Sequence, residues 1–79
     1  MALTRPRHAM PEYVEAALNR RGLLDDYRGR PTYQQNDYIA WITRAREDAT
    51  RDKRLNQMLD ELAKGGVYMN MAHAPSRKS

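Results

Sequence analysis

Apolar residues recur at intervals of three and four along the first part of the chain, a spacing that predicts short amphipathic helices. After Pro11, which suits the first helical position because it lacks an N–H, four residues follow this spacing: Tyr13, Val14, Ala17 and Leu18. Gly22 is typical of the residue just after a helix. A second short segment ends at Gly29 and carries Leu23, Leu24 and Tyr27.

The step from Arg30 to Pro31 separates this segment from the next, because the residue before a proline is pushed out of the α region. Thr32 followed by Gln35 matches a capping box, which predicts the start of a third helix. One face of that helix carries Gln34, Tyr38, Trp41, Ile42 and Ala45. We expect Trp41, the chain's single tryptophan, to be buried at the centre of the core.

A fourth helix is predicted to have Asp48 as its N-cap and to end at Gly65 and Gly66. One side of this helix carries Arg51, Leu55, Met58, Leu59 and Leu62. No stretch alternates between apolar and polar residues as a strand would. The predicted fold class is therefore all-α, a small single-domain bundle of three to four short helices.

Residues 10–66 form the predicted helical domain, and the segments on either side are predicted to be basic termini. Residues 1–9 contain Pro6 and several charges with nothing to bury, so we expect a flexible arm. Residues 67–79 lack periodicity, so we expect a tail that is partly disordered. The pattern leaves open whether Val67, Tyr68, Met69 and Met71 lie against the core.

One part of the chain holds an ordered set of residues: Tyr38, Trp41, Ile42, Ala45, Arg46, Thr50, Arg51, Arg54 and Leu55. Their order and spacing resemble the bacterial YdeI/OmpD-associated family, which is linked by name to bacteriocin protection. The resemblance extends from about Pro11 to Gly65 and implies a helical domain. Related sequences often have Pro-Glu where this chain has Asp48 and Ala49, and they tend to have a leucine at Arg30. The second departure removes an apolar contact near the loop. Many members also carry a further domain before the helical one.

The positive charge of the chain lies mainly at its ends. The chain has 79 residues and a net charge of +4, but residues 11–64 contain ten basic and ten acidic side chains. The excess comes from Arg5, Arg7, Arg77 and Lys78. A nucleic-acid module would carry its positive charge on the folded face. Residues 1–8 contain no apolar run of signal-peptide length, so we expect a cytoplasmic protein without membrane insertion.

The helical body contains no cysteine, serine or histidine, the usual nucleophiles and general bases. Carboxylates occur in adjacent pairs at Asp25–Asp26, Glu47–Asp48 and Asp60–Glu61. Neighbouring side chains on a helix diverge by about 100°, so we expect these carboxylates to be solvated rather than to form an acid–base pair. His8 and His73 have no partner at metal-ligand spacing. We therefore predict a protein that is not an enzyme and has no catalytic, metal or cofactor site.

A candidate surface for an anion or a partner is formed by basic residues around the start of the fourth helix: Arg44, Arg46, Lys53 and Arg54. A helix N-terminus offers unpaired N–H groups and the positive end of the helix dipole, both of which favour an acidic group. The alternative is that Glu47, Asp48 and Asp52 neutralise this charge locally, and we favour that alternative because surface charges are usually solvated.

Arg51 has a different environment from the other arginines. It lies within about 40° of Leu55 and Met58 on a helical wheel, so it belongs to the apolar side of the helix. A guanidinium there needs partners, and we expect it to stack on Trp41 or Tyr38 and to hold the helices together. A helix C-terminal carbonyl or a carboxylate is expected to accept its hydrogen bonds. Arg54 is about 60° further round and is expected to face solvent. The alternative is that both arginines are recognition residues.

The sequence therefore predicts a small, non-catalytic helical module of the YdeI/OmpD-associated type that docks to a protein partner. It does not identify that partner, and either a monomer or a weak dimer fits the pattern. The alternative is a nucleic-acid or phosphate-binding accessory protein that uses the basic arms and the cluster from Arg44 to Arg54. Such binding would be weak and sensitive to salt.

Overall fold

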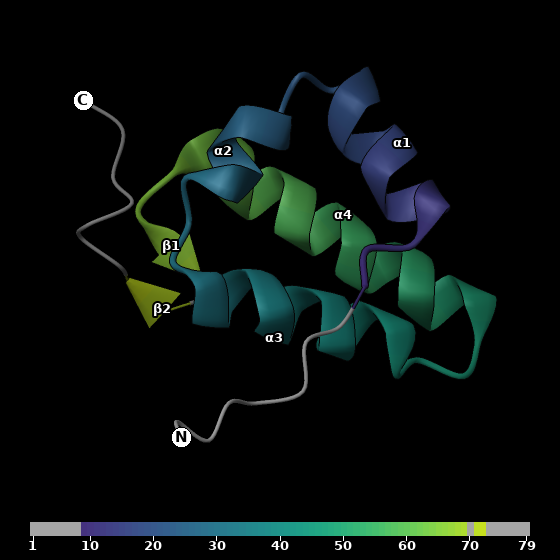
Figure 1. The fold of residues 1–79 in the computed structure, drawn as a ribbon. Helices are drawn as coiled ribbons and strands as arrows, with labels where there is room; N and C mark the ends of the chain where they lie inside the picture. Colours follow the sequence, from purple (N-terminus) through teal and green to yellow (C-terminus); the bar gives the residue numbers. More distant parts are fainter. Residues whose placement is uncertain (1–8, 70, 73–79) are drawn as a thin grey trace, which may run out of the picture.

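The computed structural model describes residues 9–69 and 71–72, and these residues form four helices and one short hairpin (Figure 1). The elements are α1 (Glu12–Arg20), α2 (Leu24–Arg28), α3 (Thr32–Thr43), α4 (Asp48–Lys64), β1 (Val67–Tyr68) and β2 (Met71–Ala72). The predicted all-α class is confirmed. The outer parts of both predicted termini, residues 1–8 and 73–79, lie outside the described residues.

The helices α3 and α4 lie antiparallel to each other, with α1 and α2 packed on the same side of α4 (Figure 1). The core fills the space between these elements, and its largest fully buried apolar side chains are Leu18, Tyr38, Ile39, Ile42, Met58 and Leu62. Full burial of each such side chain contributes about 1.5–3 kcal/mol. The apolar faces predicted for the first, third and fourth helices therefore form one core.

The start of α3 differs from the prediction. Thr32 is the first helical residue and Pro31 is the N-cap, and no side chain caps this end. The predicted capping box is wrong, because a threonine inside the first turn is not at the cap position. The Gln35 amide instead donates to the carbonyls of Arg28 at 3.2 Å and Arg30 at 2.8 Å. These bonds fasten α3 to the end of α2.

The other helix boundaries lie close to the predicted ones. The helix α1 begins one residue later than predicted, because Pro11 is its N-cap and not its first helical residue. The helix α4 begins one residue earlier than predicted, with Glu47 as the N-cap and Asp48 as the first helical residue. Gly22 and Gly65 have φ values of 66° and 72°, which favour glycine where a helix ends.

The hairpin is a feature that the sequence pattern did not predict. Its two strands pair antiparallel, with Val67 opposite Ala72 and Tyr68 opposite Met71. The Tyr68 ring lies edge-on to the Tyr38 ring at 5.2 Å between centroids. Tyr68 and Met69 pack against the core. Part of the segment predicted as a tail therefore belongs to the folded domain.

None of the helices in the described part of the chain is both long and apolar enough to cross a membrane.

Candidate interaction surface on α3 and α4

At the hairpin end of the α3–α4 pair, the carboxylate of Glu61 connects three elements. The side chain of Glu61 is buried, with the residue only 5% exposed. Its Oε1 accepts hydrogen bonds from the Tyr38 hydroxyl and, at 2.8 Å, from the N–H of Met69. Its Oε2 accepts one from the Gln57 amide at 3.1 Å. The prediction that Glu61 is a solvated surface charge is wrong, because its direction from α4 points it at α3 and the hairpin.

Arg30 extends this polar network toward α2. Its residue is 5% exposed, and its guanidinium donates to Gln34 Oε1 at 3.2 Å and to the Glu61 carbonyl at 3.1 Å. The sequence indicated a lost apolar contact at this position, but the arginine supplies a polar link between α3 and the end of α4. Every buried side-chain N or O atom among the described residues has a hydrogen-bond partner. The network is therefore satisfied from within the fold.

The network also changes the acidity of Tyr38. Burial raises the pKa of its hydroxyl well above the usual value, and the hydrogen bond to Glu61 and the negative charge of that carboxylate raise it further. The hydroxyl consequently keeps its proton, and donates it to Glu61, up to a higher pH than an exposed tyrosine would. Its role in this arrangement is to hold α3 against α4.

At the opposite end, near the connection between α3 and α4, Arg54 joins the two helices. Its Nη1 donates to the carbonyl of Trp41 at 2.7 Å, and its guanidinium lies 5.4 Å from the centroid of the Trp41 ring. This carbonyl belongs to the last turn of α3, where carbonyls lack helical partners. The prediction that Arg54 faces solvent is wrong, because the cross-helix contact with Trp41 holds it partly buried.

Arg51 bonds to a carboxylate, as predicted, but it stacks on a different aromatic ring from the predicted ones. It lies over the ring of Tyr13 in α1, 5.5 Å from the centroid, and pairs with Asp48 one turn earlier in α4. Its side chain is 33% exposed. The expected stacking on Trp41 or Tyr38 is wrong, because Arg51 is one turn nearer the start of α4 than Arg54. At that level α1 supplies the aromatic neighbour.

Trp41 also differs from the expectation. It is partly buried and packs against the edge of the core instead of lying at its centre. Of the other residues that carry the family resemblance, Ile42 and Ala45 are buried, whereas Thr50 and Leu55 are partly buried. Most of this set therefore holds the helices together.

Three of the predicted surface cations, Arg44, Arg46 and Lys53, are exposed. None of them forms an ion pair with a carboxylate of the described residues, whose ion pairs join Arg21 to Asp60 and Arg51 to Asp48. Asp48 pairs with Arg51, and the three cations are exposed to solvent, so their local neutralisation without a direct ion pair stays a prediction. We define the junction surface as Trp41, Arg44, Arg46, Lys53 and Arg54.

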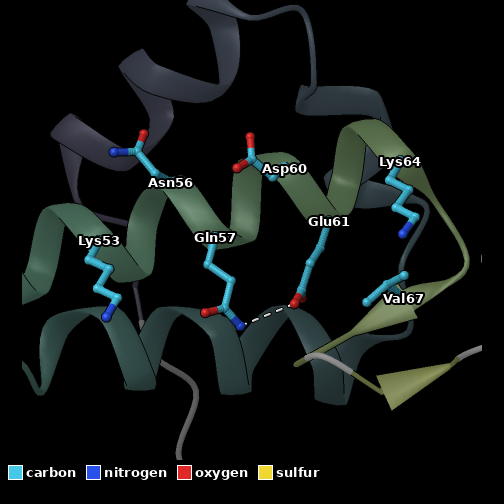
Figure 2. Close-up of a pocket in the computed structure, with 7 residues that line it drawn as sticks. All are labelled: Lys53, Asn56, Gln57, Asp60, Glu61, Lys64 and Val67. Carbon is cyan, nitrogen blue, oxygen red and sulfur yellow. Dashed lines mark hydrogen bonds between the residues drawn. The ribbon is translucent and has the colours of Figure 1, made fainter.

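An open groove of about 500 Å³ runs along α4 from the junction surface to the hairpin. Its lining residues are Lys53, Asn56, Gln57, Asp60, Glu61, Lys64 and Val67 (Figure 2). Lys53, Gln57 and Glu61 point toward α3, whereas Asn56 and Asp60 form the other edge. Of this set, only Lys53 was predicted from the sequence as a binding residue. Polar residues three and four apart on one helix face were the available signal.

The described part of the chain gathers no group of three or more His, Cys, Asp or Glu side chains that would suit a metal ion.

The described residues form a small all-α domain. The residues that carry the family resemblance include Trp41 and Arg54, whose contact joins α3 to α4. The sequence profile of one family, described as "Bacteriocin-protection, YdeI or OmpD-Associated", matches residues 8–65. The chain belongs to this family, as the resemblance implied. No curated protein and no solved structure matches the chain.

Proposed function

We propose that this protein is a non-catalytic helical module that docks to a protein partner through the junction surface. The observation that carries this proposal is the partly exposed Trp41 beneath Arg54, together with three exposed cations nearby in the sequence that form no ion pair with the described residues. Tryptophan and arginine are enriched among the residues that dominate the binding energy of protein interfaces. An exposed cation near such a pair contributes mainly to orientation and association rate.

The buried polar groups support a non-catalytic role. Arg30, Tyr38 and Glu61 bond to one another or to neighbouring groups, so their polar atoms contribute to the contacts between helices. The helical body offers no histidine, cysteine or serine that would serve as a base or nucleophile. We place this activity in the bacterial cytoplasm, with the protein acting as a monomer or a weak dimer.

One observation favours a second candidate, a phosphate-binding or nucleic-acid-binding accessory role. The exposed side chains of Arg44, Arg46 and Lys53 have no ion-pair partner within the described residues, so they are available to phosphate groups. The equal numbers of basic and acidic side chains in residues 11–64 oppose this role. Binding of this kind would weaken steeply as salt is raised.

Affinity capture from a lysate of the source cells, with and without nuclease, tests the proposal. The informative variant is Arg44→Ala combined with Arg46→Ala, because both side chains are exposed and their loss leaves the core intact. Arg20→Ala combined with Arg28→Ala is the matched control, since it removes the same charge from α1 and α2. We expect a protein that survives nuclease treatment, that the junction variant loses and that the control retains. Capture that disappears with nuclease, or that both variants retain equally, would contradict the proposal.

A further inference from the structure

The groove along α4 has an uncompensated positive charge. Of its two carboxylates, Asp60 pairs with Arg21 at 3.2 Å, and Glu61 accepts three hydrogen bonds inside the polar network. Lys53 and Lys64 are exposed and form no ion pair with the described residues. The charges that remain available to a ligand in this groove are therefore the two ammonium groups.

The positions of the two lysines set a length. Lys53 and Lys64 are eleven positions apart on α4, which is close to three full turns, so they lie on one face. At 1.5 Å per residue their Cα atoms are separated by about 16 Å along the helix axis. Gln57 lies between them and points to the same side (Figure 2). An extended chain rises about 3.3 Å per residue, so acidic side chains about five positions apart match this separation.

We propose that this groove binds an extended acidic segment of the protein partner, with two carboxylates about five residues apart at Lys53 and Lys64. The inference rests on the proposed function and extends the docking site from the junction surface along α4, because Lys53 belongs to both. The amide groups of Asn56 and Gln57 line the space between the lysines. Each of these amides can donate to and accept from the peptide backbone of such a segment.

The same groove does not suit a nucleic-acid strand. A phosphate backbone carries one negative charge on every nucleotide, so the phosphates between the two lysines would lie against Asn56 and Gln57, which carry no positive charge. A peptide with neutral residues between two acidic ones places its charges only at the lysines. The groove therefore favours the peptide on electrostatic grounds.

The test is a ¹⁵N NMR titration of the full chain with two synthetic hexapeptides of the same composition. One has glutamates at its first and sixth positions, and the other has them side by side, with serine and glycine elsewhere. We expect the separated peptide to bind more tightly and to shift the amide signals of the groove residues. Lys53→Gln and Lys64→Gln should each weaken its binding about two- to fivefold, the range typical of one exposed ion pair. Arg20→Gln, which removes a charge from α1, should leave binding unchanged.

Equal binding of the two peptides would overturn the inference, and so would indifference to both lysine substitutions. Preferential binding of a single-stranded oligonucleotide at the same residues would also overturn it. The outcome is separable from that of the capture experiment. Partner capture that depends on Arg44 and Arg46, without peptide binding, would refute only the assignment of the groove. Peptide binding without a captured protein would refute the proposed function.

Discussion

The two ends of the α3–α4 pair use polar side chains in opposite ways. At the hairpin end, Arg30, Gln34 and Glu61 are buried and bonded to one another or to Tyr38. At the junction end, Trp41 and Arg54, which lies over its ring, are partly exposed. The first end stabilises the fold, whereas the second leaves an aromatic and cationic surface available to a partner.

The difference has a physical basis in the cost of desolvation. A buried polar group that loses its partner costs about 1–3 kcal/mol, because water does not replace the missing bond. An exposed ion pair contributes about 1 kcal/mol or less, because solvent screens it. Substitutions at the hairpin end should therefore change stability, and substitutions of exposed cations at the junction end should change binding.

The largest effect is expected for Glu61→Ala. This change leaves the Tyr38 hydroxyl and the Met69 N–H without their acceptor, so it should lower the free energy of unfolding by about 3 kcal/mol or more. The neighbouring Asp60→Ala is the matched control and should cost about 0.5 kcal/mol or less, because its pair with Arg21 is exposed. Urea denaturation of both variants measures the difference. An equal loss in the free energy of unfolding for Glu61→Ala and Asp60→Ala would contradict the claim that the buried network at the hairpin end stabilises the fold.

A smaller loss is expected for Arg30→Ala. The variant breaks the bonds to Gln34 Oε1 and to the Glu61 carbonyl and leaves the first acceptor buried, which should cost about 2 kcal/mol. Arg28→Ala removes the same charge from an exposed position in α2 and should be nearly neutral. Thermal melts compare the two variants. If Arg30→Ala has the same melting temperature as the wild-type protein, the hydrogen bonds of Arg30 do not stabilise the fold.

The two motif arginines, Arg51 and Arg54, should contribute unequally to stability. Arg54→Ala should cost about 1–2 kcal/mol, because it removes both a bond to the Trp41 carbonyl and a contact with the ring. Arg51→Ala should cost about 1 kcal/mol or less, since solvent screens its pair with Asp48 and its contact with Tyr13 is at the surface. Urea denaturation gives the order of the two losses. A larger loss for Arg51→Ala would restore the order that the sequence suggested.

The smallest effect is the pH dependence that Tyr38 produces. Because its pKa is raised in the folded state, the folded protein retains the proton when the unfolded chain releases it. The stabilisation is complete below a pH of about 10 and is lost as pH rises through the folded-state pKa. We therefore expect stability to fall above that pH less steeply in Tyr38→Phe than in the wild-type protein. Urea denaturation at several pH values between 9 and 11 measures how the free energy of unfolding falls with pH in each protein. The same fall in Tyr38→Phe and in the wild-type protein would contradict the raised pKa of Tyr38.

The sequence predicted the all-α fold and the approximate ends of the helices because those features depend on local spacing. Gly22 illustrates this, since a positive φ after a helix favours glycine wherever the chain folds. The apolar faces of α3 and α4 were also visible, because burial follows the helical period. The family motif was recognisable for the same reason, although the partner of each arginine was not.

Features that depend on distant residues were missed. Glu61 and Asp60 are adjacent and chemically alike, but Glu61 meets Tyr38, which is 23 positions away, and Asp60 meets Arg21. No local rule distinguishes them. The hairpin was missed because strands of two residues are too short to show alternation. The aromatic neighbour predicted for Arg51 was wrong because helix spacing gives only the face of α4 on which a side chain lies. It does not give the point along α4 at which α1 crosses and brings Tyr13 close.

Quenching of Trp41 fluorescence tests the openness and charge of the junction surface most directly, because the chain has a single tryptophan. The partly exposed ring lies beneath Arg54, and Arg44 follows it by three positions at the end of α3. We predict that iodide quenches the native protein more strongly than caesium, and that Arg44→Gln reduces this difference. Protection of Trp41 from both ions, or stronger quenching by caesium, would contradict the account.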